Sequence, residues 1–196
     1  MNRVASVLLA AAFTAAGGLL TGPVPMASAT EARAPQAESG AAVDGAVASF
    51  GQRTINLKHD GWGDARSCVV YSRTDVRCFA THEEADRVLG YSRATDPLLR
   101  GRVDAQALPA CASGWTCLYE HINGGGRRLI FSDYYWHNLN EYDFNDKTSS
   151  WRNTQSNSYA WLARDEGGNG GTISISPNSY SSNLGAYNDW ASSVAA

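Results

Sequence analysis

The C-terminal part of this 196-residue chain is predicted to be an all-β domain of two repeated motifs, preceded by a small α+β unit of a hairpin and a helix. Three observations support this. Residues 111–196 contain five Trp and seven Tyr, in short aromatic and β-branched runs separated by Gly, Asn, Asp and Ser. A six-residue pattern occurs twice there, 43 residues apart. Residues 51–105 instead combine a hairpin pattern with a helix-capping sequence.

The charge balance excludes some partners. Charged residues make up 18% of the chain, and the formal net charge is −3. Residues 111–196 hold 5 basic and 8 acidic side chains, so the whole negative excess lies in the predicted all-β domain. Without a basic patch, a nucleic-acid partner is not expected. A mild acidic bias near loops favours a cation as partner.

The first 29 residues have the three parts of a secretory signal peptide. A short positive segment, Met1–Arg3, precedes the apolar stretch Val4–Leu20, and the A-x-A sequence Ala27–Ala29 predicts cleavage directly after it. A membrane anchor is the alternative, but Gly17-Gly18 interrupts a run already shorter than the ~20 residues that a span needs. We therefore expect a secreted, extracellular protein with no membrane partner. Residues 30–50, rich in Ala, Gly, Glu and Pro, are expected to form a flexible lead.

For an exported protein the four cysteines are expected to form two disulfides, because their number is even and the compartment is oxidising. Three connectivities are possible, and the sequence alone does not choose among them. We favour local pairing, Cys68 with Cys78 and Cys111 with Cys117. A zinc site is the alternative, but C-x9-C and C-x5-C are not the usual spacings of zinc ligands.

Residues 51–105 predict a β-hairpin followed by a helix. The β-prone run 67–72 and the returning run 76–80 flank a turn near Arg73, which would place the first two cysteines opposite each other. Thr81 and Glu84 then form a capping box, and the helix is expected to end near Leu89 because Gly90 follows. No catalytic or ligand motif occurs in this unit, and its role is left open.

The all-β prediction for residues 111–196 also identifies the side chains expected in the hydrophobic core. Residues 129 and 131, and residues 173 and 175, have the period of two that a half-buried strand needs. The expected core residues are Leu118, Leu129, Phe131, Leu139, Trp151, Trp161, Ile173, Ile175 and Leu184.

An internal repeat is the most informative feature of the sequence. Asn145-Asp146-Lys147-Thr148-Ser149-Ser150 recurs as Asn188-Asp189-Trp190-Ala191-Ser192-Ser193, with four of six positions identical. Upstream, the spacing from Tyr119 to Gly126 recurs from Trp161 to Gly168. An Asn-Leu pair also precedes each hexamer. Three landmarks in the same order predict two motifs of about 40 residues each.

The chemistry of the hexamer favours calcium. Asn-Asp supplies side-chain oxygens and turn geometry, and Ser-Ser supplies hydroxyls a few residues later. Ca²⁺ takes six to eight such hard oxygen ligands, so one hexamer cannot complete the coordination shell. With one carboxylate per hexamer, we expect dissociation constants on the order of 10⁻⁶ to 10⁻⁴ M. The alternative is that these residues only shape turns and caps.

With these motifs the sequence resembles the βγ-crystallin family over residues 111–196, although the middle aromatic of each motif is replaced by Gly124 or Glu166. The resemblance implies two Greek-key motifs in a sandwich and two Ca²⁺ sites. It implies ligands from the third-position carbonyl and fifth-position hydroxyl of each hexamer, to which the partner motif adds a carbonyl from its hairpin and an acidic or amide oxygen. The implied metal-site residues are Asn145, Asp146, Lys147, Ser149, Asn188, Asp189, Trp190, Ser192, Glu120 and Leu162. In this assignment Asp146 lies beside Ser149, and Asp189 beside Ser192.

The segment Cys111-x5-Cys117-Leu118-Tyr119-Glu120-His121, behind a signal peptide, is similar to small secreted bacterial peptidase inhibitors with the crystallin fold. Founding members of that group inhibit thermolysin-like metalloproteases. The resemblance implies an extracellular protease as a partner, and no inhibitory loop can be transferred residue by residue. A calcium-stabilised structural or carbohydrate-binding module without inhibitory activity is the alternative.

No enzyme is expected. The sequence contains neither HExxH nor G-x-S-x-G, and Gly124-Gly125-Gly126 lacks the Lys-Ser/Thr of a phosphate loop. The carboxylates Asp165-Glu166, or Asp143 with Asp146, could be paired for glycoside cleavage, but turn and Ca²⁺-ligand roles explain them more simply.

Overall fold

The computed structural model describes residues 44–100 and 108–196, which belong to one compact unit. The predicted signal peptide with its cleavage site, the first part of the predicted lead and residues 101–105 of the α+β unit lie outside the described residues. None of the described helices is both long and apolar enough to cross a membrane.

The described residues form mostly short strands. The strands are β1 (Val47–Phe50), β2 (Arg53–Asn56), β3 (Ser67–Ser72), β4 (Asp75–Phe79), β5 (Thr116–His121), β6 (Gly125–Phe131), β7 (His137–Asn138), β8 (Ser150–Asn153), β9 (Ala160–Ala163), β10 (Thr172–Ile175), β11 (Ser179–Ser181) and β12 (Ser193–Ala195). The α-helices are α1 (Leu57–Asp60) and α2 (His82–Val88). The 3-10 turns are η1 (Arg93–Thr95), η3 (Ile122–Gly124), η4 (Leu139–Tyr142), η5 (Glu166–Gly168) and η6 (Gly185–Tyr187).

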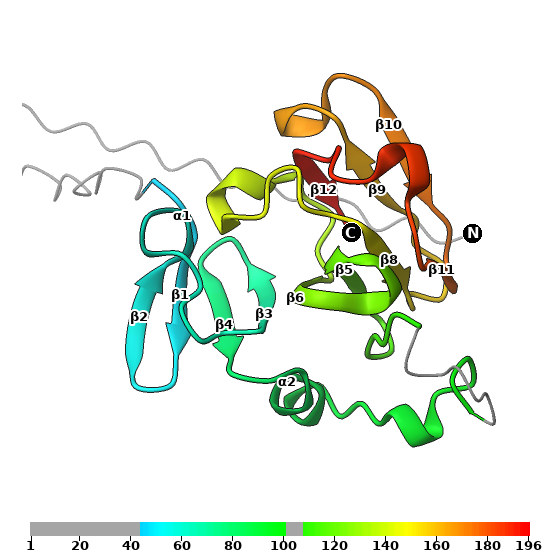
Figure 1. The fold of residues 1–196 in the computed structure, drawn as a ribbon, viewed down its shortest axis with the longest axis horizontal. Coiled ribbons are helices and arrows are strands. Elements are labelled where there is room, and N and C mark those ends of the chain that lie inside the picture. Colours follow the sequence, from blue (N-terminus) through cyan, green and yellow to red (C-terminus); the bar gives the residue numbers. More distant parts are fainter. Residues whose placement is uncertain (1–43, 101–107) are drawn as a thin grey trace, which may run out of the picture. The chain divides into compact units, whose positions relative to one another are not determined.

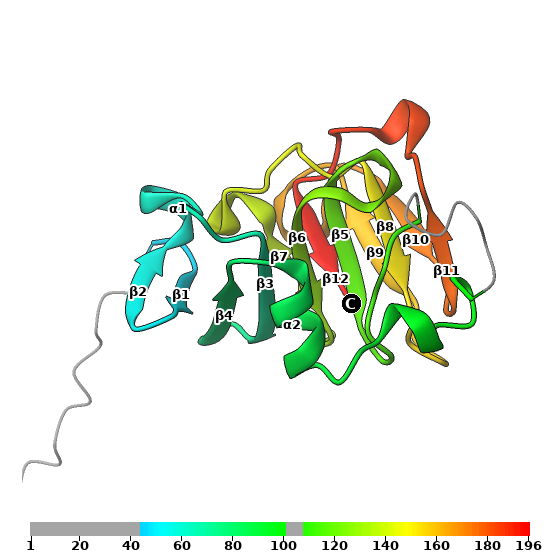
Figure 2. The same ribbon diagram turned by 60° about the horizontal axis from the view of Figure 1, so that its bottom comes forward.

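Two sheets form a sandwich (Figures 1 and 2). One has the strand order β11-β8-β5-β6-β3-β4-β1-β2, and the other β10-β9-β12-β7. The first motif places β5, β6 and β8 in the larger sheet and β7 in the smaller one. The second places β9, β10 and β12 in the smaller sheet and β11 in the larger one. This exchange of one strand in each direction confirms the predicted all-β sandwich of two Greek-key motifs.

The main core lies between the two sheets and contains most of the predicted core residues. Leu118, Leu129, Phe131, Leu139 and Ile175 are fully buried, whereas Trp151, Ile173 and Leu184 are partly buried against them, and Trp161 is also partly buried. One detail of the prediction is wrong. Strand β6 is not half-buried, because Ile130, between Leu129 and Phe131, is 0% exposed and packs in a second cluster on the other face of the sheet.

The α+β unit folds locally as predicted. Strands β3 and β4 pair antiparallel with Cys68 opposite Cys78, and these two residues form a disulfide. The second disulfide joins Cys111 to Cys117, so the local connectivity is confirmed. The Thr81 side chain accepts a hydrogen bond from the backbone N–H of Glu84 and caps α2.

The flexible lead predicted for residues 30–50 is wrong at its C-terminal end. Val47–Phe50 is strand β1, which pairs antiparallel with β2 and parallel with β4. Ala46 and Ala48 are buried, and the Ala46 N–H donates to the Glu141 carbonyl 2.8 Å away. Small residues carry little local signal, so this strand depends on tertiary pairing.

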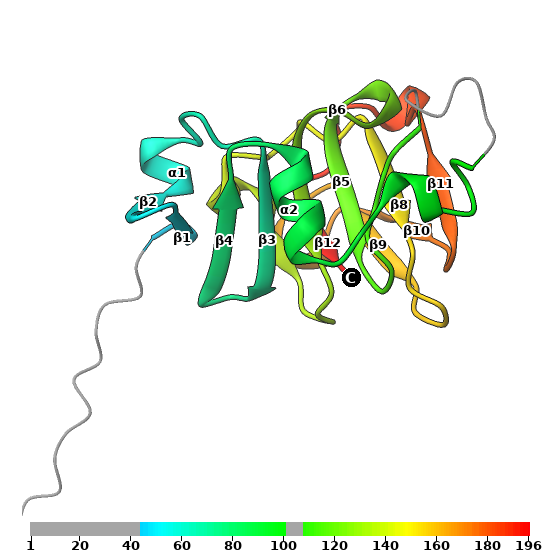
Figure 3. The ribbon, with the colours of Figure 1, turned by 90° about the horizontal axis from the view of Figure 1, so that it is seen from below.

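The α+β unit and the Greek-key sandwich share one sheet. Strand β3 pairs parallel with β6, and Cys68 stands opposite Leu129. Helix α2 lies in front of this sheet beside β3 (Figure 3), and its Ala85 packs with Ile130 in the second cluster. The N-terminal unit therefore covers one face of the first motif.

A buried arginine joins the two parts. The Arg128 side chain is 1% exposed and donates to the Ser67 hydroxyl at 3.0 Å and the His82 carbonyl at 2.9 Å. Its Nη2 also lies 2.8 Å from Asp86 Oδ1 in an ion pair. Burial, with the nearby Arg128 charge, lowers the pKa of His82 to about 4. At neutral pH His82 is thus an uncharged member of this network.

Candidate functional site

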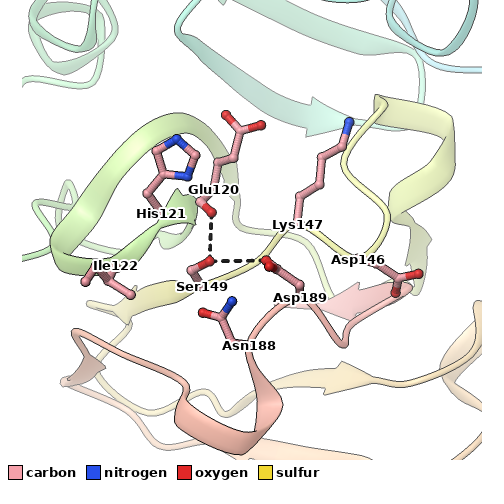
Figure 4. A pocket seen from close by; sticks show the side chains of 8 residues that line it. All are labelled: Glu120, His121, Ile122, Asp146, Lys147, Ser149, Asn188 and Asp189. Atoms are coloured by element: carbon pink, nitrogen blue, oxygen red, sulfur yellow. Dashed lines mark hydrogen bonds between the residues drawn. The ribbon is translucent and has the colours of Figure 1, made fainter.

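The two hexamers meet at one pocket (Figure 4), and each leads into a strand, β8 or β12. Six predicted metal-site residues line the pocket, together with His121 and Ile122. The six are Glu120, Asp146, Lys147, Ser149, Asn188 and Asp189.

The hexamers have the same backbone conformation and bind each other reciprocally. Asp146 and Asp189, at the second positions, both have φ +53°, a left-handed conformation that Asn and Asp adopt more readily than most residues. The Asp146 N–H donates to the Ala191 carbonyl at 3.0 Å, and the Asp189 N–H donates to the Thr148 carbonyl at 3.1 Å. Each fourth-position carbonyl thus receives the second-position amide of the other copy. This geometry explains why Asn-Asp recurs.

Three oxygens of different kinds converge at Ser149. Its hydroxyl lies 2.8 Å from the Glu120 carbonyl oxygen and 3.2 Å from Asp189 Oδ1. Figure 4 shows both contacts, with the Asp146 side chain pointing away from this cluster. The aspartate beside Ser149 therefore comes from the other hexamer.

The second copy shows the reciprocal contact, because the Ser192 hydroxyl lies 3.3 Å from Asp146 Oδ1. The resemblance implied Asp146 near Ser149 and Asp189 near Ser192, each in its own hexamer. The structure exchanges the aspartates, because the two turns lie side by side and each presents its second residue to the neighbouring turn. The pairing follows from packing of the two motifs, which residue spacing does not specify.

Leu162 is not the counterpart of Glu120. It is fully buried in β9, where it pairs with Ile173 and Val194. The Ser149 N–H donates to the Tyr119 carbonyl, whereas the Ser192 N–H donates to that of Ala163. The residues that follow these acceptors are Glu120 and Arg164, so Arg164 occupies the equivalent position in the second copy.

The glycines give the same alignment and could have revealed it in the sequence. Gly126 and Gly170 both have φ +73°, and they lie 44 residues apart. Gly124 and Gly168 are also 44 apart, and each donates its N–H to the final serine of the corresponding hexamer, Ser150 or Ser193. The predicted match of Trp161–Gly168 with Tyr119–Gly126 was therefore displaced by two residues.

Salt bridges hold the flanking charged groups away from the pocket oxygens. The Glu120 carboxylate binds Arg127 at 2.8 Å, and Lys147 Nζ lies 2.6 Å from Asp143 Oδ1. Arg127 Nη1 is also 2.9 Å from Asp143 Oδ2. Burial alone would raise the pKa of Glu120 and Asp143, but the hydrogen bonds from these cations outweigh it and hold both pKa values below their usual range. Glu120 therefore faces the pocket with its backbone oxygen.

The remaining donors suit a hard cation. Asn188 lines the pocket, and its side-chain oxygen is buried and has no hydrogen-bond partner among the described residues. A buried oxygen of this kind ordinarily has a partner. The described chain contains no cluster of three or more His, Cys, Asp or Glu side chains that could hold a metal ion. Carbonyl, hydroxyl and amide oxygens with one carboxylate are a ligand set for Ca²⁺ and not for zinc.

Comparisons with known proteins give one family match and several similar structures. Residues 104–175 match the model of peptidase inhibitor family I36. None of the curated proteins matches the chain. Similar solved structures include a βγ-crystallin from Ciona intestinalis, 28% identical, covering 42% of this chain and 98% of its own, with a TM-score of 0.37. A βγ-crystallin domain from Flavobacterium johnsoniae is 27% identical and covers 41% of this chain and 90% of its own, with a TM-score of 0.36.

Spherulin 3a from Physarum polycephalum is likewise 27% identical, covering 44% of this chain and 84% of its own, with a TM-score of 0.36. The family match is to inhibitors of peptidases and not to an enzyme family, and the two disulfides fit an extracellular protein. Over residues 104–175 this chain is thus similar to peptidase inhibitor family I36, and its two sheets form a sandwich of two Greek-key motifs.

Proposed function

We propose that this protein is exported, binds two Ca²⁺ ions between its Greek-key motifs and inhibits an extracellular protease. The observation that supports the calcium part is the exchange of aspartates between the hexamers. It brings a carbonyl, a hydroxyl and a carboxylate oxygen from three separate segments to Ser149. Turn shaping alone requires no convergence of oxygens from different segments.

At the first site, the Lys147 carbonyl, the Ser149 hydroxyl and the Glu120 carbonyl would hold the ion with the Asp189 carboxylate. The second site would use the equivalent groups of the other copy: the Trp190 carbonyl, the Ser192 hydroxyl, the Arg164 backbone and the Asp146 carboxylate. Asn145 and Asn188 open the two hexamers, and the buried Asn188 oxygen is a further donor. A bound ion would cross-link the two motifs through these groups. The bound ion would therefore contribute to the stability of the folded protein.

Calcium is expected to raise the melting temperature of the full chain and to give a titration with two sites. For a dissociation constant of about 10 μM and about 1 mM Ca²⁺, linkage adds roughly 2.7 kcal/mol per site. Ser149→Ala combined with Ser192→Ala removes one oxygen from each site and should abolish most of the shift. Calorimetric titration and thermal unfolding with and without Ca²⁺ measure this.

The matched control for the calcium experiment is Ser174→Ala, because residue 174 is an exposed serine in β10. This variant should retain the full calcium response. If neither heat nor a melting shift appears at millimolar Ca²⁺, the hexamers only shape turns and the calcium part of the proposal fails.

The inhibitor part is supported by the family match and by the rigidity of the first motif. The Cys111–Cys117 disulfide bridges the entry to β5, and an inhibitor that is already ordered pays less entropy on binding. We expect the full chain to inhibit at least one of thermolysin, subtilisin, chymotrypsin and trypsin stoichiometrically in the presence of Ca²⁺. Residual activity against a small chromogenic substrate measures this.

The protease assay requires the full chain, because the N-terminal unit shares the larger sheet with the sandwich. If all four proteases stay active at micromolar protein with the fold confirmed, inhibition is rejected. The protein would then be a calcium-stabilised structural or carbohydrate-binding module.

A further inference from the structure

The loop of residues 132–136, between β6 and β7, carries the two most exposed large apolar side chains of the described chain. Tyr134 is 66% exposed and Tyr135 is 63% exposed. The loop sequence is Ser-Asp-Tyr-Tyr-Trp, with no basic residue. Two adjacent exposed tyrosines are unusual on a free surface and typical of a binding surface.

The base of this loop is fixed from inside the sandwich. Asp133 Oδ1 lies 2.7 Å from His137 Nε2, and the His137 side chain is 1% exposed. The other ring nitrogen of His137 lies 2.8 Å from the Tyr142 hydroxyl. The Asp133 carbonyl also accepts a hydrogen bond from the Ala196 N–H at 3.2 Å. The only acidic side chain of the loop is thus used to hold its base.

The N-terminal unit supports the loop from a second side. Because β3 and β6 run parallel in one sheet, the turn after β3 and the loop after β6 leave the sheet at the same end of the strands. Arg73, in that turn, donates to the Trp136 carbonyl at 3.2 Å. Its guanidinium carbon lies 5.4 Å from the centre of the Tyr135 ring, within cation–π range.

The second motif supports the loop from a third side. The Trp136 ring packs against Gly168, where an added Cβ would collide with the indole. Gly168 has φ +82°, so the position favours glycine for its backbone as well. Three separate parts of the fold therefore fix the ends of a loop whose two central side chains remain mostly exposed.

We propose that loop 132–136 is the segment that enters the target, and that the target is an extracellular protease whose specificity pocket accepts a large aromatic side chain. This inference rests on the proposed inhibitory function. Tyrosine supplies a large contact area at low entropic cost, and a loop already held in one conformation loses little freedom on binding. The loop has no basic side chain that could enter a protease specificity pocket selective for Lys or Arg.

The test measures inhibition constants of the full chain and its variants against chymotrypsin, subtilisin, thermolysin and trypsin. Tyr134→Ala with Tyr135→Ala should weaken inhibition about 30-fold or more, as expected for aromatic hot spots. Tyr134→Phe with Tyr135→Phe should retain it. The matched control is Tyr159→Ala, which removes another exposed tyrosine (47%) and should leave inhibition unchanged. Arg73→Ala, at a positioning residue, should weaken inhibition by less than the double alanine variant.

Each result decides between the proposals. If the wild type inhibits and the double alanine variant inhibits equally, the loop assignment is overturned and the inhibitor function stands. If trypsin is the only protease inhibited, the aromatic-accepting class is overturned. If no protease of the panel is inhibited by folded protein, both proposals fail. Circular dichroism of every variant verifies that a lost effect is not lost folding.

Discussion

Arg128→Ala is expected to destabilise the protein by about 3–5 kcal/mol, because it removes one partner of a buried ion pair. The change removes the ion-pair partner of Asp86, and burial already raises the pKa of that carboxyl. It also removes the donors to Ser67 and His82. Urea unfolding followed by tryptophan fluorescence measures the loss.

The matched control is Arg77→Ala, because Arg77 pairs with Asp75 at 2.9 Å while both side chains are about half exposed. Such a surface pair contributes about 1 kcal/mol or less. Arg128→Lys keeps the charge but not the planar guanidinium, so its loss should be intermediate. Equal stabilities for Arg128→Ala and Arg77→Ala would show that the buried network does not hold the N-terminal unit to the sandwich.

Trp62→Ala is expected to cost about 3–5 kcal/mol, the usual range for a buried tryptophan. Trp62, between α1 and β3, is 3% exposed, and its indole N–H donates to the Tyr142 carbonyl at 2.7 Å. Its ring centre lies 6.0 Å from that of Phe144, and the Arg127 guanidinium carbon lies 4.9 Å from it. The variant leaves a cavity and an unpaired carbonyl at the joint between the two parts of the chain.

Thermal and urea unfolding of Trp62→Ala, with Tyr159→Ala as an exposed aromatic control, measure this effect. Tyr159 is 47% exposed, so its replacement should cost less than about 1 kcal/mol. A loss at Trp62 as small as the control would mean that this side chain contributes little to attaching the N-terminal unit. A second, early unfolding step would show that the unit detaches before the sandwich unfolds.

Local signals in the sequence were sufficient for several elements. The capping residues around Thr81 and the run of β-prone residues before Arg73 determine a helix and a hairpin through contacts a few residues apart. The hairpin then brings Cys68 and Cys78 together. The repeated hexamers likewise identified the pocket, because identical turn chemistry folds into identical turns.

The sequence did not predict which particular residues of distant segments contact each other. The position equivalent to Glu120 is Arg164 and not Leu162, because the fold aligns glycines 44 residues apart and the hexamers are only 43 apart. Ile130 is buried on the far face of β6 because α2 and its neighbours cover that face. The alternation of residues within one strand cannot reveal that a helix about 45 residues earlier in the chain packs on its second face.

The sequence by itself determined two repeated motifs of short strands, a hairpin with its helix and two oxygen-rich turns, because each depends on short-range patterns along the chain. Only the tertiary structure decided that Asp189 contacts Ser149 and that Asp146 contacts Ser192. Only it joined β3 to β6 and so placed Arg73 beside the loop of Tyr134 and Tyr135. The physical reason is that these contacts form when two whole motifs and a third segment pack together, and packing of distant surfaces leaves no mark in residue spacing.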